Sequence, residues 1–229
     1  MSKRVVAHGG TEAAGYRDVM QALETALSAR ADMFEFDVRR CGDGSLVVHH
    51  DPEIASRSLA MFDYSAADDA ARQLGYRLPR LKDVLRVARG RIQLDVELKQ
   101  DGYEHVVIEE VVQSGFDLES FVVTSFERNA VAALRAAHPE LKTGLLVYDV
   151  SGTEALQMFE QAGASFLGPD YRILDETTLR EAEAAGIGLL PWTVNDPVAI
   201  RRLLGFTAVT GVITDNPAAA VRIRDGEHA

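Results

Sequence analysis

The chain has 229 residues, of which 47% are apolar and 26% charged, with a single cysteine and a formal net charge of −11. This composition is typical of a globular protein large enough to bury a core, and it argues against a disordered or fibrous chain. The negative charge repels nucleic-acid phosphates and anionic lipid surfaces, and a lone cysteine forms no internal disulfide. No apolar run approaches the roughly 20 residues of a membrane span, and the N-terminal residues lack a signal-peptide core, so we expect a cytoplasmic protein.

Short β-rich apolar runs alternate along the chain with stretches of helical periodicity. The expected strands are 4–7, 33–38, 91–98, 121–125, 142–148, 165–168, 188–192 and 211–214. The expected helices are 18–29, 81–89, 104–114, 127–137, 153–161, 175–185 and 197–204. Eight alternating units in one chain of this length indicate an α/β fold of the (β/α)₈ TIM-barrel type, with an open doubly wound sheet as the alternative. No linker divides the sequence, so we expect a single domain over residues 1–229.

An insertion is expected after the second strand. The second and third strands begin 58 residues apart, at 33 and 91, which is about twice the other intervals. Segment 51–80 has no clear strand period and follows the end of a strand, where barrel enzymes carry active-site loops. We interpret it as a lid or small subdomain over the top of the barrel.

Two expected strands carry charged side chains on the face that should point into the barrel. Side chains alternate along a strand, so Glu35, Asp37 and Arg39 share one face, while Glu97 and Lys99 share the equivalent face of strand 91–98. Barrel interiors are normally filled by Val, Ile and Leu, and buried carboxylates are costly unless they are paired or bound to metal. Three carboxylates at one strand end would suit Mg²⁺ or Ca²⁺. An internal salt-bridge network without metal is the alternative.

Two histidines lie close to these acidic strands. His8 ends the first strand and precedes Gly9, and His50 follows the second strand after a tight turn, with Asp51 available to orient its ring. Two imidazoles beside a carboxylate-bound cation are the groups needed to cleave a phosphodiester. One accepts the proton of the nucleophile, one protonates the leaving alkoxide, and the metal stabilises the anionic transition state.

In their order and spacing these residues resemble the glycerophosphodiester phosphodiesterase family, whose signature runs H-R-G, E-N-T, E-x-D, D-G-x-x-V-V-x-H-D and E-x-K. Any one of these short motifs is weak, but together with both histidines they form a specific signal. Further similarity lies at 78–81, 192–197 and 211–215, so the resemblance covers nearly the whole chain. The matching segments are His8-Gly9-Gly10, Arg17-Asp18-Val19, Glu35-Phe36-Asp37, residues 43–51 and Glu97-Leu98-Lys99.

The resemblance implies a role for each of these side chains. His49 occupies a variable position on the opposite strand face and is excluded, and Asp215, before Asn216 and Pro217, is interpreted as a helix N-cap. The implied roles are acid/base catalysis for His8 and His50, binding of a divalent cation, Mg²⁺ or Ca²⁺, for Glu35, Asp37 and Glu97, phosphate contact for Lys99, and lining of the alcohol pocket for Trp192.

Two positions depart from the family pattern together. Gly9 replaces the arginine of H-R-G, and Arg17 replaces the glutamate of E-N-T. One hypothesis is that Arg17 restores the missing guanidinium and binds phosphate, because arginine offers a bidentate fork that suits this anion. The alternatives are that Gly9 admits a different head group, that activity is lost, or that Arg17 is a solvated residue at a helix start. Retention of both histidines and all three carboxylates argues against lost activity.

We therefore expect an enzyme, a metal-dependent phosphodiesterase that cleaves a small glycerophosphodiester into a phosphomonoester and an alcohol. The nucleophile would be water, or a neighbouring substrate hydroxyl that gives a cyclic phosphate first. The alternatives are a phospholipase-D-like or lyase branch that releases a cyclic phosphate, and a non-catalytic barrel that binds a phosphate ligand. We expect no nucleic-acid partner and no membrane span, and a homo-oligomer remains open.

Overall fold

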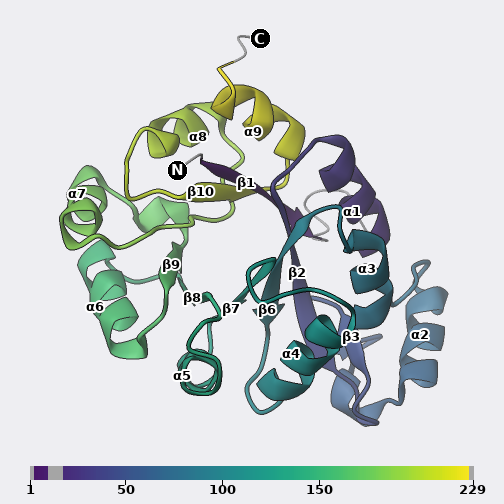
Figure 1. Cartoon of the computed structure of the whole chain (residues 1–229). Coiled ribbons are helices and arrows are strands. Elements are labelled where there is room, and N and C mark those ends of the chain that lie inside the picture. The colour runs from purple at the N-terminus through teal and green to yellow at the C-terminus, as the bar shows by residue number, and fades with distance from the viewer. Residues whose placement is uncertain (1–2, 10–17, 227–229) are drawn as a thin grey trace.

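The computed structural model of the chain describes residues 3–9 and 18–226. Strands and helices alternate along it, and the helices surround a curved sheet (Figure 1). The barrel strands are β1 Arg4–Gly9, β2 Met33–Arg40, β6 Gln93–Leu98, β7 Phe121–Ser125, β8 Thr143–Val147, β9 Phe166–Pro169 and β10 Gly211–Thr214. The helices packed around them are α1 Val19–Ser28, α3 Leu81–Ala88, α4 Glu104–Gln113, α5 Arg128–Ala137, α6 Gly152–Ala162, α7 Glu176–Ala185, α8 Pro197–Leu204 and α9 Pro217–Arg224.

The strands form one parallel sheet in the order β10-β1-β2-β6-β7-β8-β9. Segment 188–192 fills the gap between β9 and β10, because Leu189 is bridged to Leu167 on one side and to Val209 on the other. Its backbone hydrogen bonds continue that pairing, with the N–H of Leu190 donating to the carbonyl of Leu167 at 2.9 Å. The sheet thus closes on itself, which confirms the (β/α)₈ barrel over the open sheet.

The expected seventh strand appears as isolated bridges instead of a continuous ladder. Pro191 lies near its end and has no N–H to donate, which interrupts the pairing. The final helix α9 follows β10, where the interpretation of Asp215 as an N-cap implies a helix. The short strand β3, Leu46–Val48, was not predicted as a strand, and it pairs antiparallel with the end of β2.

Local sequence explains where the helices begin and which face they bury. Side chains of Asp63, Ser151, Asp175 and Asp196 accept hydrogen bonds from backbone N–H groups of the first helical turns, which satisfies donors that have no partner within the helix. Apolar side chains of the helices and of the outward strand faces pack into two large buried clusters. The first cluster surrounds β2, β6 and β7, and the second cluster surrounds β8, β9 and β10.

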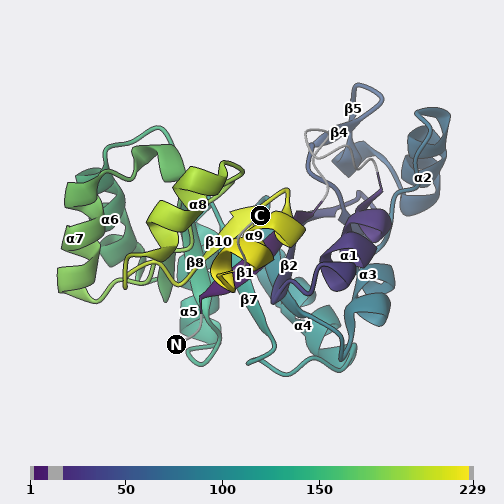
Figure 2. The same cartoon turned by 90° about the horizontal axis from the view of Figure 1, so that it is seen from above.

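The insertion builds a small core of its own. It contains β4 Glu53–Ile54, β5 Arg57–Ser58, the 3₁₀ helix η2 Leu59–Met61 and the helix α2 Tyr64–Gln73. Ile54, Leu59 and Phe62 pack with α2 and with Val47 of β3. Within the described chain no residue of 51–80 lines the central cavity, and the segment stands to one side of the barrel, next to β2 and β3 (Figures 1 and 2). Segment 51–80 thus forms a small subdomain beside β2 and β3.

Within the described residues, no helix combines the length and the apolar character needed to cross a membrane.

Candidate active site

Strand register gathers the charged residues at the carboxyl ends of β1, β2 and β6. His8, Glu35 and Asp95 are paired in register across these three strands. Two residues further along, Asp37 of β2 is paired with Glu97 of β6. Side chains two residues apart on a strand point to the same face, so both rows project into the barrel. The inward orientation expected for Glu35, Asp37 and Glu97 is therefore what the structure shows.

The three carboxylates converge in a way that suits a cation. Oxygens of Glu35, Asp37 and Glu97 lie within 4.8 Å of one another, and all three residues are buried. The Oε1 atom of Glu35 is buried without a hydrogen-bond partner in the described chain. Oxygen ligands of this kind are those that hard divalent cations prefer, and an unpartnered buried carboxylate oxygen is costly without one. The donor set thus fits Mg²⁺ or Ca²⁺.

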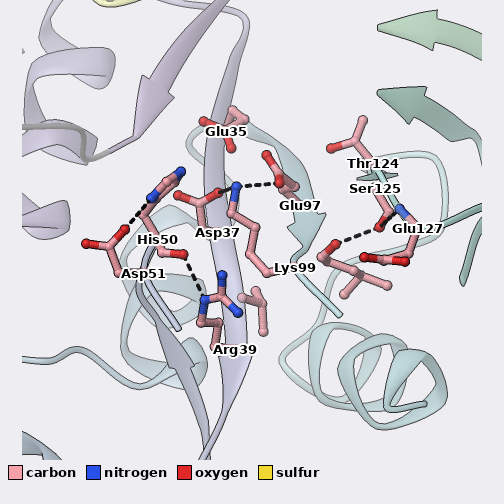
Figure 3. Close-up of polar contacts among 12 residues, drawn as sticks. Glu35, Asp37, Arg39, His50, Asp51, Glu97, Lys99, Thr124, Ser125 and Glu127 are labelled. Carbon is pink, nitrogen blue, oxygen red and sulfur yellow. Dashed lines mark hydrogen bonds and ion pairs between the residues drawn. The ribbon is translucent and has the colours of Figure 1, made fainter. Parts of the chain in front are cut away.

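The alternative of an internal salt-bridge network is only partly realised. Lys99 extends along β6 and places its Nζ 3.0 Å from Asp37 Oδ1 and 2.5 Å from Glu97 Oε1 (Figure 3). Arg39 points elsewhere, and its Nε donates to the carbonyl of His50 at 2.8 Å. One ammonium group faces a cluster of buried carboxylates, so negative charge remains in excess. Lys99 is itself nearly buried, at 11% side-chain exposure, and is not a solvated residue at a strand end.

The titration of the cluster reflects this excess. Burial, followed by repulsion from Asp37 and Glu97, raises the pKa of Glu35 well above its usual value. Burial and then repulsion from Asp37 raise the pKa of Glu97 to about 8, and burial raises that of Asp95 to about 7. Burial alone would lower the pKa of Lys99, but its two ion pairs outweigh burial and raise it. A cation among these carboxylates would relieve the repulsion.

His8 is held by Asp215, which follows the neighbouring strand β10, and Asp215 is held in turn by Asn195. Its Nδ1 lies 2.7 Å from Oδ1 of Asp215, which follows β10, and its Nε2 lies 3.7 Å from Glu35 Oε2. Asn195 donates from Nδ2 to Asp215 Oδ2 at 2.6 Å and accepts the N–H of Asp215 at 2.9 Å. A carboxylate only accepts hydrogen bonds, so Nδ1 of His8 donates to Asp215, and Nε2 is the ring nitrogen directed at the acidic cluster.

The sequence interpretation of Asp215 as a helix cap was wrong. The side chain of Asn216 caps α9, because its Oδ1 accepts the N–H of Ala219 at 3.2 Å. Asp215 orients His8 instead. The signal that could have found it is its position directly after a barrel strand, the same position that drew attention to His8.

The two consecutive histidines take opposite directions, as the strand alternation predicts. His50 lines the cavity, and its Nδ1 contacts Asp51 Oδ1 at 2.8 Å (Figure 3). His49 is directed to the insertion, where its ring stacks on Tyr76 at 6.2 Å between centroids. Burial lowers the pKa of His49. The structure therefore brings His8 and His50 to the cavity and leaves His49 out.

A cavity of about 410 Å³ connects the acidic cluster with an aromatic wall. Trp192 lines it as expected, and its Nε1 donates to the carbonyl of Gly168 at 2.8 Å. Phe126 packs edge to face against both Trp192 and Tyr148, with ring centroids 5.5 Å apart in each pair. Asp95, Asp170 and Arg172 were not singled out from the sequence as site residues. Asp95 is buried beneath the acidic cluster, and the other two line the wall opposite it.

Arg17 lies outside the described residues, so its expected contact with phosphate stays a prediction. Gly9 is described, and its N–H donates to Glu35 Oε2 at 3.1 Å. A Cβ atom at position 9 would lie 2.0 Å from the carbonyl oxygen of Glu35 and 2.8 Å from the ring of Phe34. Any side chain at this position would therefore require the backbone to shift, which explains a glycine here.

The closed barrel, the buried carboxylates and the two cavity-lining histidines are typical of a barrel enzyme with its active site at the carboxyl ends of the strands. Comparison with known proteins agrees with this class. The model of the glycerophosphoryl diester phosphodiesterase family matches residues 8–219. The chain belongs to this family, and it is accordingly a phosphoric diester hydrolase.

Relatives align over almost the entire chain. The glycerophosphodiester phosphodiesterase of Caldanaerobacter subterraneus subsp. tengcongensis is 26% identical over 241 residues, which cover 97% of this chain and 98% of that protein. The solved structure of a glycerophosphodiester phosphodiesterase from Thermotoga maritima matches with a TM-score of 0.80 and 22% identity, covering 97% of this chain and 99% of its own. A phosphodiesterase of Oleispira antarctica, solved with the product sn-glycerol-3-phosphate, matches with a TM-score of 0.78 and 21% identity over 98% and 97% of the two chains.

Proposed function

We propose that the protein hydrolyses a glycerophosphodiester to a phosphomonoester such as glycerol 3-phosphate and a free alcohol, with a divalent cation and a pair of histidines. The observation that carries this proposal is the convergence of Glu35, Asp37 and Glu97 within 4.8 Å, in the cavity that His8 and His50 also line. Family membership and the product bound to the Oleispira antarctica phosphodiesterase support the same reaction.

In this proposal Glu35, Asp37 and Glu97 hold Mg²⁺ or Ca²⁺. When bound, the cation supplies the positive charge that offsets the charge developing on the phosphoryl oxygens. Lys99 adds a second positive charge at the rim of the same cluster, where its Nζ is fixed by two carboxylates. An ammonium group held in this way can contact a phosphate oxygen without losing its position.

The two histidines exchange protons with the substrate. In this proposal His8 exchanges a proton at Nε2, while Asp215, which contacts Nδ1, stabilises the imidazolium form. His50 is oriented through Nδ1 by Asp51 and lies nearer to solvent, with a side chain that is 53% exposed. One ring removes the proton from the nucleophile and the other protonates the oxygen of the departing alcohol.

The test begins with protein freed of metal by a chelator and assayed against glycerophosphocholine, glycerophosphoethanolamine and glycerophosphoglycerol. Restoring Mg²⁺ or Ca²⁺ should restore hydrolysis, and phosphorus NMR should show glycerol 3-phosphate as the product. Calorimetric titration with the same ions separates binding from turnover.

Each alternative has its own outcome in this experiment. Equal activity with and without chelator would contradict the metal site. A cyclic phosphate as the final product would identify a phospholipase-D-like or lyase reaction. Binding of glycerol 3-phosphate without turnover of any diester would identify a non-catalytic barrel.

A further inference from the structure

A second charged group lies on the cavity wall opposite the acidic cluster. β9 is four strands away from β2 in either direction around the closed barrel, so the residues that follow β9 face Asp37 across the cavity. Asp170 and Arg172 are these residues, and both line the cavity. Asp170 is paired in register with Trp192 of the neighbouring segment, so the two side chains lie on the same inward face.

Asp170 holds the guanidinium of Arg172 along the edge formed by Nε and Nη2. Asp170 is buried, at 4% exposure, and its two oxygens accept from the backbone N–H of Arg172 at 2.9 Å, from Nε at 2.9 and 3.0 Å and from Nη2. These bonds satisfy both oxygens of the Asp170 carboxylate. The Nη1 group has no hydrogen-bond partner among the described residues, and the side chain is 76% exposed at the cavity.

We propose that Arg172 binds a negatively charged substituent on the alcohol half of the substrate, at a subsite formed with Tyr148 and Trp192. This inference rests on the proposed function, because it takes the phosphate to lie at the acidic cluster. The substituent bonded to that phosphate then extends across the cavity to the opposite wall. There a guanidinium already held in place loses little freedom on binding a carboxylate or a second phosphate.

Positive charges already present at this wall disfavour a quaternary ammonium group. Phe126 packs edge to face against both Tyr148 and Trp192, so these rings are already engaged with one another through Phe126. Lys99 lies over the ring of Phe126 at 5.8 Å, so a cation already approaches that ring. A positively charged head group would also meet the charge of Arg172.

The test uses three glycerophosphodiesters of four-carbon alcohols, whose terminal group is anionic, neutral or cationic. The alcohols are 4-hydroxybutyrate, 1,4-butanediol and 4-aminobutanol. The wild-type protein should show the highest kcat/KM with the hydroxybutyrate diester and the lowest with the aminobutanol diester. Arg172→Gln should lower kcat/KM for the hydroxybutyrate diester about 10- to 100-fold, the range expected for one hydrogen-bonded charge, and change the butanediol diester little.

Two further variants separate recognition from a structural role. Arg172→Gln leaves the buried Asp170 without its partner, so the double variant Asp170→Asn with Arg172→Gln removes both charges together. If Arg172 binds the substituent, the double variant keeps the selective loss. Arg201→Gln removes an exposed arginine of α8 that does not line the cavity, and it should behave as wild type.

The outcomes that overturn the inference are distinct from those that overturn the proposed function. Wild-type protein that hydrolyses none of the three diesters in the presence of metal refutes the proposed function. Hydrolysis of all three with equal efficiency, or preference for the aminobutanol diester, refutes only the role of Arg172. An equal loss on all three substrates in Arg172→Gln, recovered in the double variant, shows that Arg172 only compensates a buried charge.

Discussion

Replacing Asp215 by alanine should slow catalysis without weakening substrate binding. The carboxylate accepts a 2.7 Å hydrogen bond from Nδ1 of His8, and both side chains are less than one fifth exposed. A hydrogen bond to a charged group at such a site contributes about 1.5–3 kcal/mol. If this stabilisation is lost when the imidazolium forms, kcat falls about 10- to 100-fold, since each 1.4 kcal/mol corresponds to a factor of ten. KM should change little, because Asp215 does not line the cavity.

The loss of kcat in Asp215→Ala cannot exceed the loss caused by removing His8, the ring that Asp215 positions. General acid or base catalysis by one histidine contributes about 10²- to 10⁴-fold, so His8→Ala should lose on that order. Because Asp215 acts through His8, the double variant should be no slower than His8→Ala alone, which is the non-additive behaviour of residues that work as a unit. Initial rates on glycerophosphodiesters with saturating Mg²⁺ or Ca²⁺ measure all three variants.

A matched control is Asp196→Ala. Asp196 also follows a barrel segment, but it is exposed, and among the described residues its side chain accepts hydrogen bonds only from the N–H groups of Val198 and Ala199 at the start of α8. Its removal should lower stability by about 1 kcal/mol and leave kcat unchanged. The positioning role of Asp215 is refuted if Asp215→Ala has wild-type kcat, or if its loss multiplies that of His8→Ala in the double variant.

Three further predictions concern the metal, the second histidine and the cysteine. Glu97→Gln should remove one ligand oxygen and the charge that attracts the cation, so calorimetry should show loss of Mg²⁺ or Ca²⁺ binding and assays a loss of most activity; binding equal to wild type would contradict the ligand set. His50→Ala should lower kcat about 10²- to 10⁴-fold while His49→Ala loses little, and the reverse order would show that the two rings exchange roles. Cys41 is buried, and burial raises its pKa to about 11, so a disulfide reagent should label the native protein slowly at pH 8 and faster as the pH rises toward 11. Rapid native labelling at pH 8, matching that of the denatured chain, would show that this thiol is accessible and ionised.

Periodicity and alternation in the sequence were sufficient to predict the barrel. Strands such as β2 carry apolar residues on the face that meets the helices, and helices such as α3 carry one apolar stripe, so the repeated pattern specifies the layers locally. The same alternation placed Glu35, Asp37 and Glu97 inside the barrel, because a period of two fixes the face of every residue once one face is known. It also separated His50 from His49 correctly.

Contacts between distant segments could not be predicted in this way. Asp215 and His8 are 207 residues apart in sequence and meet only because β10 pairs with β1 when the barrel closes. The pair formed by Asp170 and Arg172 is local, but its position opposite the acidic cluster follows from the number of strands around the barrel. The sequence by itself determined which residues face inward, since that depends on local backbone geometry. Only the tertiary structure decided which of them meet, because register and closure are set by packing of the whole sheet.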